Sequence, residues 1–356
     1  MANFVENSII NSLLILDGAT GTEVARLGGK MDSASWCAVA NKTNPEIVKQ
    51  VHEEYLRAGV DIITTNTFAT CRHVLEGSGL GDETKNINRI AVNLAKEACE
   101  NVSPSKPILI AGSMSNTVAW KKGTGSPDLK FYPPPEKEIE NYKEMSNILA
   151  ESGVDLIILE MMLDIERSSR ILEIVIETGL PVWVGISCSE NDLGDIIGFD
   201  LSVERSESTS YEHEFEKKHK LIDIITSLKV IGGEVYGIMH TSIPTTYKAL
   251  EILFNNWSGP TMVYPEIMTF DYSTHQSTTS VSPDEFSVAC RDFANKGVQV
   301  VGGCCGTTIE HICKITSGAF ENLPSQISIG ETQRQICLKL RQDILERGGD
   351  NSPYLI

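Results

Sequence analysis

The chain has 356 residues, of which 41% are hydrophobic, 22% charged and 6% aromatic. This composition is typical of a compact protein with a large core, and it excludes disordered, collagen-like and coiled-coil chains. The formal charge of −18 disfavours nucleic acids and anionic membranes as partners, because an acidic surface repels both.

Eight short, almost continuously apolar runs recur along the chain, and each is typical of a strand buried on both faces. They are residues 13–17, 60–66, 107–113, 154–160, 181–187, 234–240, 260–264 and 298–305. Amphipathic stretches between them predict helices over 45–58, 84–100, 136–152, 164–178, 212–228, 244–255, 283–296 and 307–319. Prolines in the first helical turn and glycines at the helix ends support these boundaries: Pro45, Pro244, Pro283, Gly59, Gly153, Gly179 and Gly297.

Eight alternations of strand and helix predict parallel strands with right-handed crossovers, closed into a (β/α)8 barrel, the TIM barrel of the α/β class. The alternative is an open doubly wound sheet. It is less favoured because the turn after the first strand has glycines only at Gly18 and Gly21, in the wrong spacing for a dinucleotide-binding turn. We expect the barrel to span residues 1–325, followed by a helical tail over 326–356 that could serve an interface between copies of the chain.

Two long segments interrupt this rhythm after predicted strands. Residues 113–135 are rich in glycine and proline, and residues 188–211 are acidic and rich in serine. Long loops at the C-terminal ends of barrel strands commonly cover an active site. We therefore expect both segments to shape a substrate pocket.

The sequence also indicates a reducing compartment. No apolar run is long enough to cross a bilayer, and the first residues lack the basic region and cleavage site of a signal peptide. The nine cysteines are odd in number and do not follow the spacing of a small disulfide scaffold. We expect a cytoplasmic protein in which seven cysteines are ordinary thiols, while the adjacent pair Cys304 and Cys305 needs another explanation.

Polar residues stand at the ends of the predicted strands, where a barrel enzyme carries its chemistry. Asp17 and Glu160 are the two carboxylates among them. They could act as general acid and base, or they could hold the ammonium group of an amino acid. For Asp17, a local turn or helix cap is the structural alternative.

Cys304 and Cys305 lie in the segment GGCCGTT, and His240 ends the sixth apolar run. Two adjacent thiolates can bind one metal ion, and the flanking glycines allow the backbone to aim both sulfurs inward. Two buried thiols are an equally good interpretation of the pair alone. In a barrel, however, His240 faces the same space, and a His-Cys-Cys set leaves one coordination position open, as in catalytic zinc sites.

Five segments of the chain resemble the homocysteine S-methyltransferase family of zinc-dependent thiol methyltransferases, which includes betaine-homocysteine methyltransferase and the first module of cobalamin-dependent methionine synthase. These segments are LLILDGATGTEV, DIITTNTF, INRIAVNLAKEA, VDLIILEMMLDIE and VVGGCCGTTIEHI. The resemblance extends over residues 10–320. It implies a barrel in which zinc activates the thiol of homocysteine, and a methyl group from a small donor then forms methionine.

The resemblance also implies roles for individual residues. Asp17 and Glu160 match the acidic residues that hold the amino-acid end of homocysteine, while Cys304 and Cys305 match two of three zinc-binding cysteines. The third ligand departs from the family, because His240 stands in the place of a cysteine. Glu266 replaces an asparagine, and Met161 replaces a threonine.

Two interpretations of the altered site follow. Neutral imidazole in place of thiolate raises the net charge of a zinc site by one. Glu266, if it approaches the metal, could restore the lost negative charge and fill the open coordination position in the absence of substrate. Alternatively, the donor, the acceptor or the metal differs from that of the family. We favour retained zinc.

The methyl donor is predicted to be a small free molecule, such as a betaine, S-methylmethionine, S-adenosylmethionine or another sulfonium, because no cobalamin- or folate-binding domain follows residue 320. The aromatic residues Trp120, Phe131 and Tyr132 could face a methylated cation, although packing of their own loop is the favoured interpretation. Two other functions stay open: methyl transfer to or from a different thiol or sulfonium compound, and binding of an amino acid without catalysis.

Overall fold

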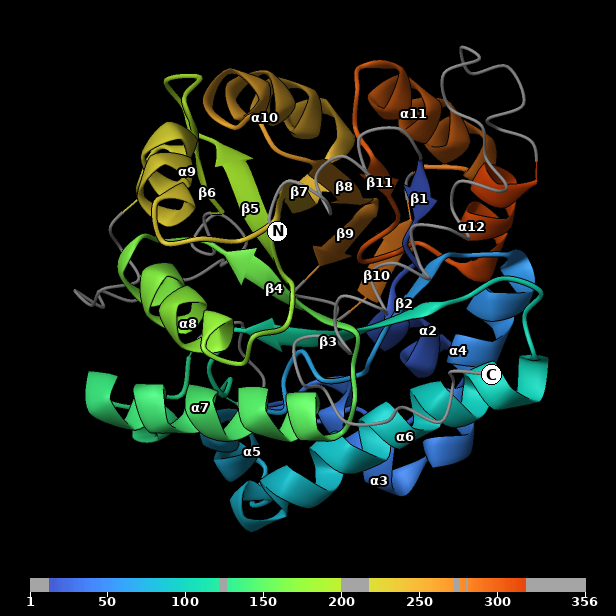
Figure 1. The fold of residues 1–356 in the computed structure, drawn as a ribbon, viewed down its shortest axis with the longest axis vertical. Coiled ribbons are helices and arrows are strands. Elements are labelled where there is room, and N and C mark those ends of the chain that lie inside the picture. The colour runs from blue at the N-terminus through green and yellow to red at the C-terminus, as the bar shows by residue number, and fades with distance from the viewer. Residues whose placement is uncertain (1–12, 122–126, 200–217, 272–275, 280, 318–356) are drawn as a thin grey trace.

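Eight parallel strands form the centre of the protein (Figure 1). The computed structural model describes residues 13–121, 127–199, 218–271, 276–279 and 281–317. In the order of their pairing, the strands are β1 (Leu14–Ile15), β11 (Val300–Val301), β8 (Thr261–Glu266), β7 (Val235–Ser242), β5 (Val182–Glu190), β4 (Leu156–Met162), β3 (Leu109–Ser115) and β2 (Ile62–Thr64).

The two outer members of this order, β1 and β2, meet and close the barrel. Leu16 forms a parallel bridge with Ile62, and the amide of Asp17 donates to the Ile62 carbonyl at 3.0 Å. The amide of Asp61 donates in turn to the Ile15 carbonyl at 2.8 Å. The predicted barrel is confirmed, and the open sheet is excluded because neither β1 nor β2 is left as a free edge.

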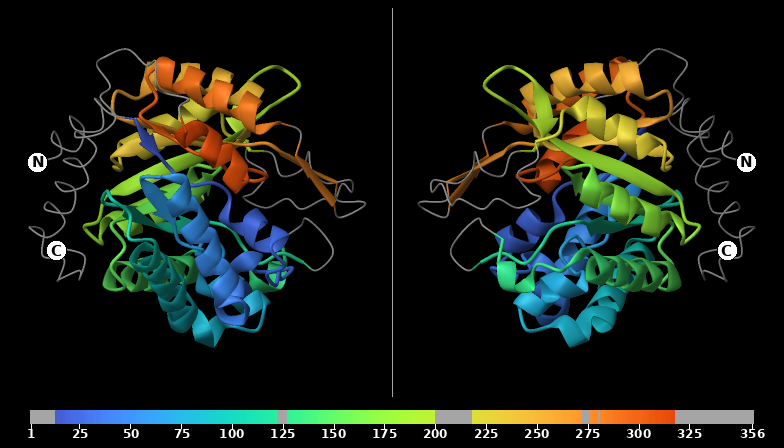
Figure 2. Two further views of the ribbon diagram at one scale, coloured as in Figure 1. Left: turned by 90° about the vertical axis from the view of Figure 1, so that its right-hand side faces the viewer. Right: turned by 90° about the vertical axis from the view of Figure 1, so that its left-hand side faces the viewer.

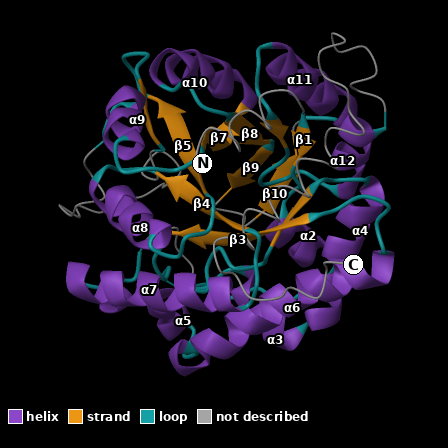
Figure 3. Cartoon of the chain, viewed as in Figure 1, coloured by secondary structure: helices purple, strands orange, loops and turns teal. Residues whose placement is uncertain are grey.

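Helices surround the strands on the outside (Figures 1 and 3). The longer ones are α4 (Pro45–Ala58), α6 (Thr84–Val102), α7 (Pro135–Glu151), α8 (Glu166–Ile176), α9 (Leu221–Lys229), α10 (Ile243–Asn256), α11 (Pro283–Asn295) and α12 (Ile309–Thr316). Pro45 opens α4 as predicted, and Ser282 and Glu285 form a capping box at the start of α11. Gly59 ends α4 with a φ of 94°, a conformation that glycine adopts at no steric cost.

The core has two layers, one inside the barrel and one between the barrel and the helices. The inner layer contains Leu14, Ile62, Leu109, Trp183, Met239, Met262, Tyr264 and Val300, with Cys304 and Met161 packed against it. The outer layer joins the other faces of the strands to the helices. Each buried aliphatic side chain contributes roughly 1.5–3 kcal/mol to folding, so both faces of every strand favour the same closed arrangement.

Several local predictions need correction. Residues 188–198 form a hairpin and not a loop, because β5 continues to Glu190 and pairs with antiparallel β6 (Ile196–Gly198) across a turn held by the Asn191 side chain. Among the described residues, α9 begins at Leu221, later than predicted. The short helices α2 (Thr20–Arg26), α3 (Ala40–Thr43) and α5 (Arg72–Gly77) were not predicted.

The hairpin of β9 (Met268–Asp271) and β10 (Gln276–Thr279) was not predicted either, and it projects from the body of the protein (Figure 2). It follows β8, and therefore lies at the end of the barrel where the parallel strands finish. The predicted tail over 326–356 lies outside the described residues. Within the part of the chain that is described, no helix is both long and apolar enough to cross a membrane.

Candidate metal centre

His240 lies near the end of β7, where a bulge turns its side chain toward the mouth of the barrel. The pairing of β7 with β8 shifts register between Met239 and Ser242, and His240 has a φ of 43° in the left-handed region. Ser187 of β5 holds this bulge, since its hydroxyl lies 3.0 Å from the Met239 carbonyl and 2.9 Å from the His240 carbonyl. A non-glycine residue in this conformation costs about 1–3 kcal/mol, and such strain clusters at functional sites.

Cys304 and Cys305 follow β11 in a tight turn that is bound to the end of β8. The Cys304 amide donates to the Pro265 carbonyl, and the Ile267 amide donates to the Cys305 carbonyl, both at 3.0 Å. Gly306 has a φ of 85°, and a Cβ atom there would lie 2.7 Å from Cβ of Met268. The glycine next to the cysteines therefore permits a close approach of two chain segments that no larger residue would allow.

These two segments bring three ligand atoms together. Nδ1 of His240 lies 3.6 Å from Sγ of Cys304, and the two sulfur atoms are 3.9 Å apart. The ligand atoms of His240, Cys304 and Cys305 all lie within 4.8 Å of one another, and this is the one such group of three among the described residues. The predicted convergence of His240 with the cysteine pair is confirmed.

The spacing of these atoms agrees with a tetrahedral metal ion. Zinc bonds of about 2.0–2.1 Å to nitrogen and about 2.3 Å to sulfur separate a nitrogen from a sulfur ligand by about 3.6 Å, and two sulfurs by about 3.8 Å. The observed separations are 3.6 Å and 3.9 Å. The imidazole and thiol donors suit the same ion, so chemistry and geometry both fit a zinc site.

One of the two thiols, that of Cys305, is favoured for ionisation. A hydrogen bond from Cys304 lowers the pKa of Cys305 well below its ordinary value, and the nearby His240 lowers it further. The same hydrogen bond raises the pKa of Cys304, because that thiol is the donor. The pair therefore favours one thiolate before any metal arrives, and thiolates are the form of cysteine that binds metals.

Asp17 is buried at the end of β1 and is bound to the neighbouring strand β2. Its carboxylate accepts hydrogen bonds from the Thr64 amide at 2.7 Å and from the Thr64 hydroxyl at 2.8 Å. Burial raises its pKa to about 8, against the lowering effect of these hydrogen bonds. The turn or cap considered from the sequence does not occur, because helix α2 has no side-chain cap.

Glu160 is the second carboxylate, and it belongs to β4. The Ser113 hydroxyl donates to it from β3, and burial raises its pKa to about 7. Tyr264 of β8 lies close enough to lower the pKa of Glu160, yet its buried hydroxyl makes no hydrogen bond of good geometry within the described residues. That hydroxyl lies beside the Glu160 carboxylate.

The two carboxylates share one electrostatic property. Among the described residues, no lysine or arginine forms an ion pair with Asp17 or Glu160, whereas the buried Glu138 is paired with Arg167 and Arg170. Negative charge nearby raises both pKa values further, because Glu160 raises the pKa of Asp17 and Cys305 raises the pKa of Glu160. An ammonium group placed beside them would remove this cost.

Other strand-end residues do not take part in this group. Asn66 is occupied by Cys37 and Asn41, and Cys188 is buried with its amide bound to Thr241. The loop aromatics mainly contact their own surroundings: Phe131 lies against Lys130, and Tyr132 lies against Arg167. The contact of Phe131 lies within its own loop, whereas Tyr132 contacts Arg167 of α8.

Two residues of the site were missed by sequence reasoning. Phe199 packs against the His240 ring with 5.2 Å between ring centroids, and Thr64 supplies both hydrogen bonds to Asp17. Thr64 could have been found, because it lies in the second strand motif, on the strand that pairs beside Asp17. Phe199 offered no signal, since only the β5–β6 hairpin brings it to the metal centre.

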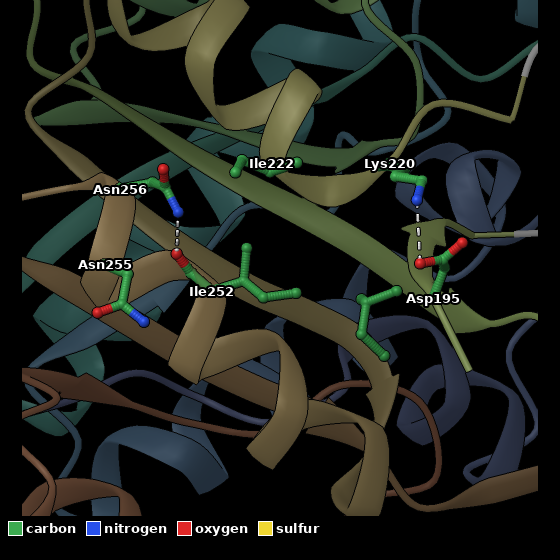
Figure 4. A pocket seen from close by; sticks show the side chains of 7 residues that line it. Asp195, Lys220, Ile222, Ile252, Asn255 and Asn256 are labelled. Carbon is green, nitrogen blue, oxygen red and sulfur yellow. Dashed lines mark hydrogen bonds and ion pairs between the residues drawn. The ribbon is translucent and has the colours of Figure 1, made fainter. Parts of the chain in front are cut away.

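A separate cavity of about 400 Å³ lies on the outside of the barrel, between β6, α9 and α10 (Figure 4). Its lining includes Ile222 and Ile252 and an ion pair of 3.0 Å between Lys220 and Asp195. It contains no thiol, histidine or unpaired buried carboxylate. The groups that can carry out chemistry therefore lie at the mouth of the barrel and not in this outer cavity.

Comparison with known proteins agrees with this arrangement. The family model for homocysteine S-methyltransferase matches residues 14–318. The homocysteine S-methyltransferase YbgG of Bacillus subtilis is 26% identical, covering 86% of this chain and 94% of its own length. Homocysteine S-methyltransferase 2 of Arabidopsis thaliana is 25% identical, covering 83% of this chain and 89% of its own.

A solved structure has the same fold. The metallated form of the homocysteine methyltransferase MmuM from Escherichia coli superposes with a TM-score of 0.65 at 20% identity, covering 86% of this chain and 96% of that one. The family match extends over the barrel strands, both carboxylates and the Cys304–Cys305 segment. The chain belongs to the homocysteine S-methyltransferase family and is an S-methyltransferase that acts on homocysteine.

Proposed function

We propose that the protein transfers a methyl group from a small sulfonium or ammonium donor to homocysteine at a zinc ion held by His240, Cys304 and Cys305, and so forms methionine. One observation carries this proposal: Sγ of Cys304 lies 3.6 Å from Nδ1 of His240 and 3.9 Å from Sγ of Cys305, the separations of a tetrahedral zinc site, and all three ligand atoms lie within 4.8 Å of one another. When bound, zinc would lower the pKa of the homocysteine thiol, so that a nucleophile exists near neutral pH.

In this proposal Asp17 and Glu160 bind the ammonium group of homocysteine. Asp17 is buried and Glu160 is partly buried, and neither forms an ion pair with a lysine or arginine among the described residues. Thr64 and Ser113 hold the two carboxylates in place by hydrogen bonds. The Tyr264 hydroxyl, which lies beside Glu160, is suited to a polar group of the same substrate.

The protein's own residues also exclude water from the thiol. His240 is only 15% exposed, and the Phe199 ring covers one side of it. A drier site strengthens the attraction between the metal, its ligands and the bound thiolate. A reducing compartment such as the cytoplasm would keep Cys304 and Cys305 free to bind metal, and we propose that location on this ground.

Metal analysis tests the proposal directly. We expect the purified protein to hold about one zinc ion per chain, and we expect His240→Ala and Cys304→Ala to lose it. Cys313→Ala, which changes an exposed cysteine away from the site, is the matched control and should keep the metal. Absence of zinc after reconstitution would contradict the proposed metal centre.

A second measurement identifies the reaction. The protein is supplied with homocysteine and a panel of betaine, S-methylmethionine and S-adenosylmethionine, and methionine is measured. We expect at least one donor to give methionine, and His240→Cys to keep metal and activity with a changed pH dependence, because thiolate lowers the charge of the site by one. Zinc binding without methionine from any donor of the panel would contradict the proposed donor class.

A further inference from the structure

The side chain of Met239 joins two strands of the site. Met239 precedes the proposed metal ligand His240 on β7, and it is only 2% exposed in the inner layer of the core. Its sulfur atom accepts a hydrogen bond at 3.3 Å from the amide of Met161 on β4. That amide belongs to the peptide bond between Glu160 and Met161. One side chain therefore connects the backbone beside the metal centre to the backbone beside the carboxylate.

A glycine on the strand between them makes this connection possible. β7, β5 and β4 lie side by side in the barrel (Figure 1), so the Met239 side chain must cross β5 to reach β4. Gly185 of β5 lies at the crossing point. A Cβ atom there would lie 2.9 Å from Cγ of Met239 and 3.1 Å from the Leu159 carbonyl oxygen. Any larger residue would therefore force the Met239 side chain to shift.

The backbone is held differently at the two ends of this connection. On β7, the Met239 carbonyl accepts hydrogen bonds from the hydroxyls of Ser187 at 3.0 Å and Thr241 at 2.7 Å. On β4, the register with β5 shifts between Leu159 and Met162, so Met161 has no partner in this pairing. The contact with the Met239 sulfur therefore fixes the peptide bond beside Glu160 on the side that faces β5.

We propose that Met239 is a positioning residue that sets the separation between the metal centre and the Glu160 carboxylate. This inference rests on the proposed function, in which the thiol of homocysteine binds the metal and its ammonium group binds Asp17 and Glu160. Homocysteine is a short molecule, so both of its ends bind well together only at one separation of the two sites. A misplacement of about 1 Å can cost a reaction about a hundredfold in rate.

The test measures how two thiols bind to the protein loaded with cobalt(II) in place of zinc, because a thiolate that binds cobalt changes its absorption. Homocysteine reaches both sites, whereas 4-mercaptobutanoate has the same chain without the amino group. Met239→Leu nearly keeps the side-chain volume and removes the sulfur acceptor. We expect it to weaken homocysteine binding roughly five- to tenfold, at the low end for a lost hydrogen bond because sulfur is a weak acceptor. Binding of 4-mercaptobutanoate and zinc affinity should stay unchanged, because Ser187 and Thr241 still hold the backbone before His240.

Three further variants make the result specific. Met239→Gln offers an oxygen acceptor on a side chain of similar length and should recover part of the homocysteine binding. Met145→Leu makes the same exchange at a buried methionine of α7, in the outer layer of the core, and should change the binding of neither thiol. Glu160→Gln should weaken homocysteine binding by itself, and adding Met239→Leu should then have little further effect, because both changes act on one contact.

Two results would overturn the inference. Unchanged homocysteine binding in Met239→Leu would mean that Met239 does not position Glu160. An equal loss for both thiols would mean that the substitution disturbs the metal centre or the fold and not the separation of the two sites. The unchanged protein tests the proposed function separately: equal binding of both thiols would contradict the role of the carboxylates, and no absorption change with either thiol would contradict the metal centre.

Discussion

Single residues in this protein show a conflict between stability and function. Asp17 is buried and accepts two hydrogen bonds from Thr64, yet burial still raises its pKa to about 8. The unfolded chain releases this proton near the ordinary value of 3.8, whereas the folded chain keeps it until about pH 8. The stability of the substrate-free protein therefore falls as pH rises through this interval.

Asp17→Asn should remove this dependence. We expect its melting temperature at pH 8.5 to exceed that of the unchanged protein by a few degrees, while binding of homocysteine is lost because the amide cannot pair with an ammonium group. Calorimetry of both proteins at pH 8.5 and pH 5 provides the measurement. The difference should shrink at pH 5, where the folded protein keeps Asp17 protonated; an equal difference at both pH values would contradict the electrostatic explanation.

At the scale of elements, two strands each contain a bulge at the position of the residue that they contribute to the site. β4 shifts register between Leu159 and Met162, next to Glu160, and β7 shifts between Met239 and Ser242, around His240. Met161 and His240 both have a φ in the left-handed region, at 55° and 43°. A regular strand would alternate these side chains between the two faces, so the bulges re-aim them toward the mouth of the barrel.

Ser187 offers a way to test the bulge in β7 without touching a ligand. In Ser187→Ala the carbonyls of Met239 and His240 lose their hydroxyl donor, and a lost buried hydrogen bond costs about 1–3 kcal/mol. We expect zinc affinity to fall by roughly tenfold or more, as it does when a supporting partner of a metal ligand is removed.

Zinc affinity by chelator competition measures this effect, with Ser152→Ala as the control. The Ser152 hydroxyl is buried without a hydrogen-bond partner in the described part of the chain, so its removal should change neither metal binding nor folding. An equal loss of zinc affinity in both variants would show that Ser187 does not position His240.

For the molecule as a whole, we expect two buried neutral histidines to lower the folding stability in acid. His52 of α4 and His73 of α5 are both almost fully buried, and burial lowers the pKa of each to about 4 from 6.5. Below about pH 6.5 these two histidines become protonated in the unfolded chain, whereas in the folded chain they stay neutral until about pH 4. The contribution of these two histidines to stability is therefore complete above about pH 6.5 and is lost as pH falls toward 4, opposite in sign to the contribution of Asp17.

The expected loss is about 2 kcal/mol for each histidine at pH 5. His52→Met keeps a large apolar side chain at this position and removes one of the two titrating groups. We expect its melting temperature to fall less between pH 7.5 and pH 5 than that of the unchanged protein. Thermal unfolding over this range is the measurement, and an identical pH dependence would show that His52 does not control acid stability.

The sequence alone determined the barrel and the identity of its chemical groups. Eight strands buried on both faces must be continuously apolar, and helices must be amphipathic, so both patterns are visible in a linear chain. Asp17, Glu160, His240, Cys304 and Cys305 were found for the same reason, because a polar residue at the end of such a strand stands out from its neighbours.

Only the tertiary structure decided how these groups meet. The bulges in β4 and β7, the support of His240 by Ser187, the contact with Phe199 and the approach of Glu266 all join residues that lie on different strands. Such contacts depend on register between strands, and a shift of one residue reverses the face of every side chain. Hydrophobic pattern fixes which strands are buried, but the distances between ligand atoms exist only once the barrel has closed.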